Sequence, residues 1–582
     1  MTDRHASQLR LAGSVVLTAV FHAPAFFDPD ATGFGDWQQI HHAWEVGVVA
    51  VRRWGEWPLW NPHHCGGVTM LGNPESQHWS PFFPLALVFS STHVLKLVLV
   101  LHAWLGLVGA YRLARREHGL STFAASIAAV GFSMSGFFAW QMAGGHFTFV
   151  SFYLAPWLLL AFRASIRDLR WVAAVALLLA LSVAEGGTYP FPYFVLLLAF
   201  DGAVVALGSR RDVLLRARRV LAAGLGAGLL AALVGAIRFL PIVRTLELYP
   251  RDEPSYDRMY LHEMVDVWTR YDFPWRHPDH PFVWNEYTAF VGWPLFSLGL
   301  LGIVVALRRR RFGLVAGLAI FVALMLGNRG PWAPWELLHS LPVYDSLKVP
   351  SRFSVFATLY LALLAGLAID ELRRGARRLG SVLGDRGLRI AGRTAKALTF
   401  LLAAGPAVAF GAVTHARWDG PPVSGEPADR FHLVPAAHYQ YEIASLPRRN
   451  LGTPACYIGS MRWDISRRLW VGDRPQVRVQ GPGEVVRARR TNHTVEADVR
   501  MEGPGRVLFN QNYHPDWTER SGFRVANDGG LLAVDVPAGA HRLKVRYEPA
   551  TLFTAANLSL LGLVVCGLVL FRPRRARLVG GR

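Results

Sequence analysis

Cysteine is scarce in this sequence, which has three cysteines among 582 residues. Cys65, Cys456 and Cys566 lack the paired spacing of a cysteine metal site, so that kind of site is excluded. Cys566 lies in a long apolar run. Cys65 and Cys456 could form a disulfide outside the cell, but the interpretation that we favour from the sequence is two free thiols.

Acidic residues are also in deficit. The sequence has 41 Asp and Glu residues and 61 Lys and Arg residues, which gives a net charge of +20. Such an excess can serve nucleic acid, anionic lipid or membrane topology. The basic residues cluster in short runs between apolar stretches, at 112–116, 163–170, 210–219, 308–311, 373–396 and 572–577. This is the positive-inside pattern of a membrane protein, and it argues against a nucleic-acid partner.

Apolar residues make up 52% of the chain, which is too apolar and too long for one soluble core. Counting runs long enough to cross the hydrocarbon predicts about twelve transmembrane helices. They lie near 10–27, 93–113, 121–141, 147–163, 171–187, 190–208, 220–240, 288–307, 312–327, 354–371, 397–415 and 552–571. Alternate connections carry the Arg runs, so we expect both termini in the cytoplasm. The first run has a loose signal-peptide-like end at Ala23-Pro-Ala25, but we favour a retained helix.

The connections without Arg runs are long and rich in Trp and Pro, and we expect residues 28–92, 238–287 and 327–353 to face outside. Residues 416–549 change to short alternating runs, such as 476–480, 494–500 and 541–547, which predict strands. The predicted fold is therefore a polytopic α-helical membrane module over 1–415, an extracytoplasmic β-sandwich-like domain over 416–549, and a final helix with a basic cytoplasmic tail over 550–582.

The first outer loop contains the carboxylate with the strongest case for chemistry. Ionisable groups are costly deep in lipid, so acids and bases are expected in loops near helix ends. Asp36 follows Gly33-Phe-Gly35, where glycines let the backbone approach a ligand and the carboxylate could act as a general base. A solvated or helix-capping Asp is the alternative.

Other polar residues of this loop could bind a metal or a sugar. His41 and Glu45 have the i, i+4 spacing of a metal-binding helix face, although a polar interfacial helix explains them as well. A divalent metal is therefore possible, but none is required. Trp60, Asn61 and Gln77 combine flat aromatic surface with amide groups, as sugar sites do, and aromatic belts look similar.

Further candidates lie in the other connections. His146 occupies a short outer turn, and Glu286 precedes a span, where both could equally be structural or solvated. Arg238, Lys348 and Arg352 are outward cations at the apolar boundary, the opposite of what positive-inside predicts. They are candidates to bind a phosphate or pyrophosphate, or else they snorkel to headgroups.

A series of short motifs resembles the YfhO family of bacterial membrane proteins. The motifs run in order along the whole chain: Pro58-Leu-Trp-Asn-Pro62, Asn73-Pro-Glu-Ser-Gln-His78, Gly145-His146, Ala155-Pro-Trp157, Glu286-Tyr287, Val291-Gly292, Val349-Pro-Ser-Arg-Phe353, Asn512-Tyr-His-Pro-Asp-Trp517, Val536-Pro-Ala-Gly-Ala-His541 and Tyr547-Glu-Pro549. Two positions depart from the pattern, since Asp516 stands where Gly is more usual and Lys348 stands where Arg is expected. The second departure keeps the charge but loses a bidentate phosphate contact.

The resemblance implies a branch of the glycosyltransferase C superfamily. It implies an enzyme of the bacterial cytoplasmic membrane that takes a sugar from a polyprenyl-phosphate donor on the outer face and passes it to a cell-envelope acceptor. We expect a single displacement, which makes the enzyme an inverting one. Asp36 would be the base, with Arg238, Arg352 and Lys348 around the departing phosphate. The alternatives are a transporter or flippase of lipid-linked saccharide and a non-catalytic assembly factor. The chain lacks the internal repeat that usually marks a transporter.

Overall fold

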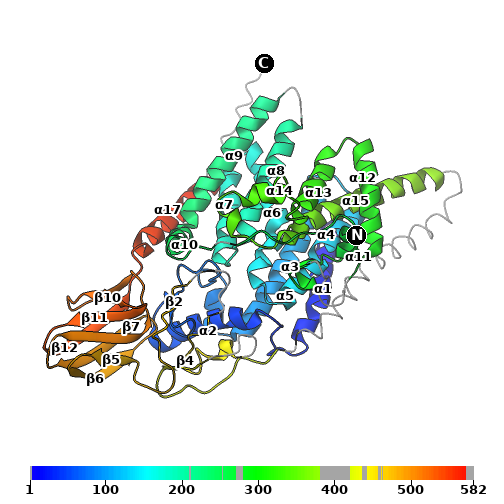
Figure 1. The fold of residues 1–582 in the computed structure, drawn as a ribbon. Coiled ribbons are helices and arrows are strands. Elements are labelled where there is room, and N and C mark those ends of the chain that lie inside the picture. The colour runs from blue at the N-terminus through cyan, green and yellow to red at the C-terminus, as the bar shows by residue number, and fades with distance from the viewer. Residues whose placement is uncertain are drawn as a thin grey trace.

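The protein consists of a helical bundle followed by a β sandwich and a last helix (Figure 1). The computed structural model describes residues 3–208, 212–251, 253–270, 280–380, 418, 420–435, 442–456, 461 and 463–571. Its principal helices are α1 (Asp3–His22), α2 (Trp37–Trp54), α3 (Ser91–Arg116), α4 (Thr122–Ser133), α5 (Gly136–Ala143), α6 (Ala155–Arg167), α7 (Val172–Ala184), α8 (Pro190–Leu207), α9 (Val213–Val234), α10 (Ala236–Leu248), α11 (Glu263–Thr269), α12 (Gly292–Arg308), α13 (Phe312–Met325), α14 (Pro334–His339), α15 (Ser354–Gly380) and α17 (Leu552–Leu570).

Apolar helices identify a multi-pass membrane protein. Seven helical segments of the described chain are long and apolar enough to cross a bilayer: 91–116, 122–143, 147–167, 190–207, 213–234, 350–376 and 552–570. Shorter apolar helices cover 11–26, 169–184, 292–308 and 312–325. The eleventh predicted span, 397–415, lies outside the described residues. The predicted span 220–240 is divided, because α9 ends at Val234 and α10 begins at Ala236.

Helix α15 lies at the centre of the bundle, and its most apolar window is completely buried. Helices α4, α12 and α13 pack against it. Glycine makes the contact with α12 close, because a Cβ added at Gly302 would lie 2.1 Å from the carbonyl oxygen of Leu364. The segment that leads into α15 is therefore held on a rigid central element.

The Arg-bearing connections contact one another. Arg163 forms an ion pair with Asp201 at 2.6 Å and lies 3.5 Å from Glu117. Arg311 donates to the carbonyl oxygen of His118 at 2.6 Å. These contacts join the ends of helices that the charge pattern assigns to one side of the membrane.

The β sandwich consists of two four-stranded antiparallel sheets with the orders β10-β11-β8-β5 and β6-β7-β12-β9. The strands are β5 (Val477–Gln480), β6 (Gly483–Arg490), β7 (Thr494–Met501), β8 (Gly505–Asn512), β9 (Trp517–Glu519), β10 (Val525–Asp528), β11 (Leu531–Val536) and β12 (Gly539–Tyr547). The alternating runs predicted as strands correspond to β5, β7 and β12. Alternation brings Val495, Val499 and Val545 inward, so the prediction of a β-rich region before the last helix is confirmed.

The first loop of the chain docks on this sandwich. Two short strands, β1 (Trp60–Asn61) and β2 (Val68–Thr69), pair with each other, and Trp60 packs against Trp517 and Tyr547 of the sandwich core. Helix α2 lies across the end of the bundle near the sandwich (Figure 1). Glu56, just after α2, accepts hydrogen bonds from the Thr491 hydroxyl and nearby backbone amides.

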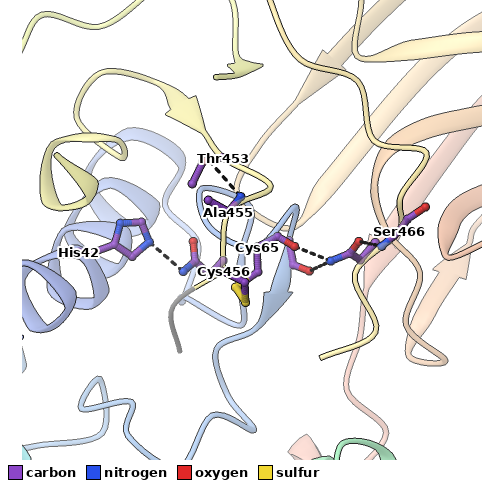
Figure 2. Close-up of a disulfide and its surroundings, with 9 residues drawn as sticks. His42, Cys65, Thr453, Ala455, Cys456 and Ser466 are labelled. Atoms are coloured by element: carbon purple, nitrogen blue, oxygen red, sulfur yellow. Dashed lines mark hydrogen bonds between the residues drawn. A yellow bond between two sulfur atoms is a disulfide. The ribbon is translucent and has the colours of Figure 1, made fainter. Parts of the chain in front are cut away.

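A disulfide joins Cys65 of this loop to Cys456, so the prediction of two free thiols is wrong (Figure 2). Backbone hydrogen bonds bring the two segments together: Cys65 donates to Ala455, and Gly66 donates to Thr453. Asn512 of β8 donates to the carbonyl oxygens of Cys65 and Gly67 at 2.6 and 3.0 Å. Sequence spacing could not reveal this pair, because 391 positions separate the two cysteines.

The charge pattern predicts which connections reach the outside. In a Cys566→Ala background, single cysteines at the exposed positions Leu261 and Trp332 should react with an impermeant maleimide in intact cells. Cysteines at the exposed positions Arg116 and Asp212 should react only after permeabilisation. Labelling of Arg116→Cys in intact cells would reverse the assignment of sides.

Candidate functional site

A polar cavity of about 240 Å³ lies where the connections that lack Arg runs meet. Its polar lining comes from α2 and the loops on either side of it, the turn after α5 and the 3-10 helix that follows, the start of α8, the chain after α10, and the segments at the 3-10 helices η5 (Trp284–Glu286) and η7 (Pro350–Phe353). The residues that line it are Asp36, Gln39, Ile40, Glu75, Gly145, His146, Thr148, Phe149, Tyr189, Arg251, Phe282, Glu286, Lys348 and Arg352. The predicted site residues Asp36, His146, Glu286, Lys348 and Arg352 are thus brought together.

Asp36 is placed by a close approach of two glycine-containing loops. Its amide donates to the carbonyl oxygen of Gly144 at 3.0 Å, and the indole of Trp37 donates to Met142 at 2.8 Å. Gly145 has φ +88°, and a Cβ there would lie 2.2 Å from the amide nitrogen of Trp37. Only glycine fits this position, which is why His146 can lie beside Asp36.

His146 lies between two carboxylates. Its Nε2 is 3.3 Å from Oδ2 of Asp36 and 3.5 Å from Oε1 of Glu286, and its Nδ1 contacts Oε1 of Gln141. Burial alone would lower the pKa of His146. The charge of Glu286 and the hydrogen bond and charge of Asp36 outweigh burial and the nearby Arg352, so the pKa is raised.

Glu286 and Arg352 form a buried bidentate ion pair. Arg352 donates through Nε and Nη2 at 3.0 and 2.8 Å, and its guanidinium lies over the rings of Phe149 and Tyr189 at 4.8 and 4.4 Å. Burial alone would raise the pKa of Glu286. The charges of Arg352 and His146, together with hydrogen bonds, lower it to about 2. Glu286 is therefore a negative charge in the cavity lining.

Arg251 and Lys348 form a second charged group on the cavity wall. Arg251 lies 3.8 Å from Glu75 and 3.9 Å from Glu253, and Lys348 lies 3.8 Å from the same oxygen of Glu253. Among the described residues, Nε of Arg251 has no hydrogen-bond partner, although its side chain is only 5% exposed. This nitrogen therefore has hydrogen-bonding capacity for an anion.

Three lining residues were not predicted from the sequence, although it contains a signal for each: Arg251, Glu75 and Tyr189. Arg251 is a cation in a connection that we expect to face outside, which is the criterion that selected Lys348. Glu75 lies inside the motif Asn73–His78. Tyr189 lies between α7 and α8 in a stretch rich in Gly and Pro, and such a stretch is tolerated in a membrane protein where it lines a cavity.

The remaining predicted binding residues lie elsewhere and are hydrogen-bonded. Trp60 is buried in the sandwich core and donates to Gln511 at 2.6 Å. Asn61 contacts His42 at 3.0 Å, and Gln77 accepts from Trp44 and donates to Glu185. Each of these side chains stabilises the first loop.

Arg238 also lies away from the cavity lining. It is 1% exposed and donates to the backbone carbonyl oxygens of Leu71 and Asn73 at 2.6 and 2.7 Å. It clamps the loop that carries Glu75. We therefore assign no donor-binding role to Arg238.

His41 and Glu45 do not converge on a metal site. Glu45 accepts two hydrogen bonds from Arg448 at 2.6 and 2.9 Å and one from Ser91 at 2.6 Å, and His41 lies 3.4 Å from the same Ser91 hydroxyl. Within the described part of the chain, no group of three or more His, Cys, Asp or Glu side chains could hold a metal ion. We propose no metal at this pair.

The chain is similar in structure to two kinds of glycosyltransferase. The apo oligosaccharyltransferase of Archaeoglobus fulgidus aligns with a TM-score of 0.45 and 15% identity, over 76% of this chain and 64% of that one. The same oligosaccharyltransferase in complex with Zn and sulfate gives 0.46 and 13%, over 77% and 62%. The arabinofuranosyltransferase AftD from Mycobacteria gives 0.43 and 16%, over 78% and 32%. This chain thus spans less than two thirds of each.

No protein-family profile matches the chain, and no curated protein sequence matches it. The resemblance to the YfhO family therefore stays a prediction.

The Glu286 and Arg352 pair should make a large contribution to stability. Glu286→Gln or Arg352→Gln leaves an uncompensated buried charge, so each should cost roughly 3–5 kcal/mol of unfolding free energy in detergent. The double variant should cost less than the sum of the two. Because the pKa of Glu286 is lowered, its contribution should be complete above pH 4.5 and lost as the pH falls to about 2.

Lys348→Gln is the matched control, because Lys348 is 31% exposed and its ion pair is long. It should cost about 1 kcal/mol or less. Single variants of Glu286 and Arg352 as mild as this control would show that the pair is not a structural anchor.

Proposed function

We propose that this protein transfers a sugar from a polyprenyl-phosphate donor to a hydroxyl group of a cell-envelope acceptor on the outer face of the membrane, with inversion at the sugar C1. The observation that carries the proposal is one cavity that holds both a carboxylate at its wall, Asp36, and the cations Arg251 and Lys348. A base and an anion-binding group within one cavity are what a single displacement of a phosphate-linked sugar needs.

The step needs only groups that line the cavity. Asp36 takes the proton of the acceptor hydroxyl as the acceptor oxygen bonds to C1. The bond between C1 and the phosphate oxygen breaks, and its electron pair leaves with the phosphate. Arg251 and Lys348 stabilise the charge that develops there. Arg352 is paired with Glu286, so its part is to hold Glu286 and to shape the wall with Tyr189.

Several features support an outer-face site. The cavity is built from connections that lack Arg runs, and those connections are expected outside. The disulfide lies in the same first loop that carries Asp36. Disulfides form and persist in oxidising compartments. With the motif resemblance, these features favour an envelope enzyme of the bacterial cytoplasmic membrane.

Asp36→Asn should lower turnover by about two to four orders of magnitude, because Asn keeps the size and polarity of Asp but cannot take a proton. Transfer of labelled sugar from a polyprenyl-phosphate donor in proteoliposomes measures this, with donor binding measured separately. A transporter or flippase with the same cavity would keep moving lipid-linked sugar in this variant.

Asp28→Asn and Asp30→Asn are the controls. Oδ1 of Asp28 accepts from the amides of Asp30 and Ala31, as in an Asx turn, and Asp30 pairs with His93 at 3.2 Å. Both variants should keep most of the activity. Full activity in Asp36→Asn would remove Asp36 from the mechanism.

Arg251→Gln should weaken use of the donor. A hydrogen bond to a charged group contributes about 1.5–3 kcal/mol, so kcat/KM for the donor should fall on the order of 10- to 100-fold. Arg244→Gln is the matched control, because Arg244 is 44% exposed and does not line the cavity. Equal donor affinity in the two variants would contradict a phosphate site at Arg251.

A further inference from the structure

The contacts of His146 indicate which of its two ring nitrogens carry protons. Nε2 of Gln141 donates to the backbone carbonyl oxygen of Asn285 at 2.9 Å. The amide oxygen of Gln141 could not take the place of Nε2, because it would face the carbonyl oxygen of Asn285, which is also an acceptor. The oxygen of Gln141 is therefore directed at Nδ1 of His146, and Nδ1 must carry a proton.

The other ring nitrogen faces two acceptors. Nε2 lies 3.3 Å from Asp36 and 3.5 Å from Glu286. With Nδ1 already protonated, a neutral ring would direct a lone pair at two carboxylate oxygens. An imidazolium instead donates from both nitrogens and offsets part of the negative charge.

Glu286 keeps this arrangement in place during a reaction. The groups that face His146 are Asp36 from the loop before α2, Glu286 from η5, Arg352 from η7, Gln141 from α5 and the ring of Phe149. Arg352 holds Glu286 ionised. When Asp36 takes a proton from an acceptor, His146 therefore still faces one full negative charge.

We propose that His146 works as a positioning residue in its protonated form, which donates from Nε2 to Asp36 and holds its carboxylate in the orientation that accepts the acceptor proton. The expected effect on the reaction rate rests on the proposed function. The hydrogen bond from His146 to Asp36 does not rest on it. It predicts that the reaction fails at alkaline pH, because deprotonated His146 presents a lone pair to Asp36 and displaces the carboxylate.

The kinetic test is the pH profile of kcat/KM. The wild-type protein should lose activity as one proton leaves, at a pH above the ordinary pKa of 6.5 for histidine. His146→Gln should lower kcat roughly 10- to 100-fold, as expected for a misplaced base, without the alkaline loss and with unchanged donor binding. His93→Gln, at the exposed histidine that pairs with Asp30, should behave as wild type. A His146→Gln profile with the wild-type rate and the wild-type alkaline loss would overturn the proposal.

A second measurement does not need activity. In protein labelled with ¹³C at histidine Cε1, the His146 signal, assigned by its loss in His146→Gln, should titrate above pH 6.5, and its pKa should fall in Asp36→Asn. A pKa of His146 below 6.5, or one that Asp36→Asn leaves unchanged, would overturn the proposal whether or not the protein transfers sugar. If sugar transfer is absent but this titration is found, the proposed function fails while the His146 contact stands.

Discussion

A charge buried away from water needs an opposite charge beside it. The cavity depends on the way in which the buried carboxylate of Glu286 is paired. Glu286 binds Arg352 on one side and faces His146 on the other. Arg352 in turn lies over Phe149 and Tyr189, which form the wall. One carboxylate thus links η5 and η7 with the turn after α5, and through His146 it reaches Asp36.

The side of α2 that faces away from the cavity is also fixed. The 3-10 helix η8 (Ile443–Ser445) and the residues after it dock on α2: His42 contacts the carbonyl oxygen of Ile443 at 2.7 Å, and Glu45 binds Arg448. Asp36 immediately precedes this helix. The region before the sandwich therefore stabilises the helix that follows the proposed base, although none of its described residues contributes a side chain to the cavity lining.

The sequence predicted what depends on local pattern. Apolar runs predicted most of the membrane helices, and the alternation of apolar and polar residues predicted β5, β7 and β12. The position of loops near helix ends predicted the site residues Asp36, His146 and Glu286, because ionisable groups in membrane proteins concentrate there. It could not separate Lys348, which lines the cavity, from Arg238, which clamps backbone carbonyls, because both are cations at an apolar boundary. Contacts that join distant segments, such as Cys65 with Cys456, leave no local signal.

The disulfide also constrains how the protein is made. Synthesis runs from the N-terminus, so the loop that carries Cys65 emerges early, whereas Cys456 follows 391 residues later. The loop cannot reach its final covalent form until the bundle helices between the two cysteines have been synthesised and Cys456 has reached the same compartment. Closure of the first loop is in this way coupled to the synthesis of the helices between the two cysteines, and a chain that ends before residue 456 lacks this covalent link.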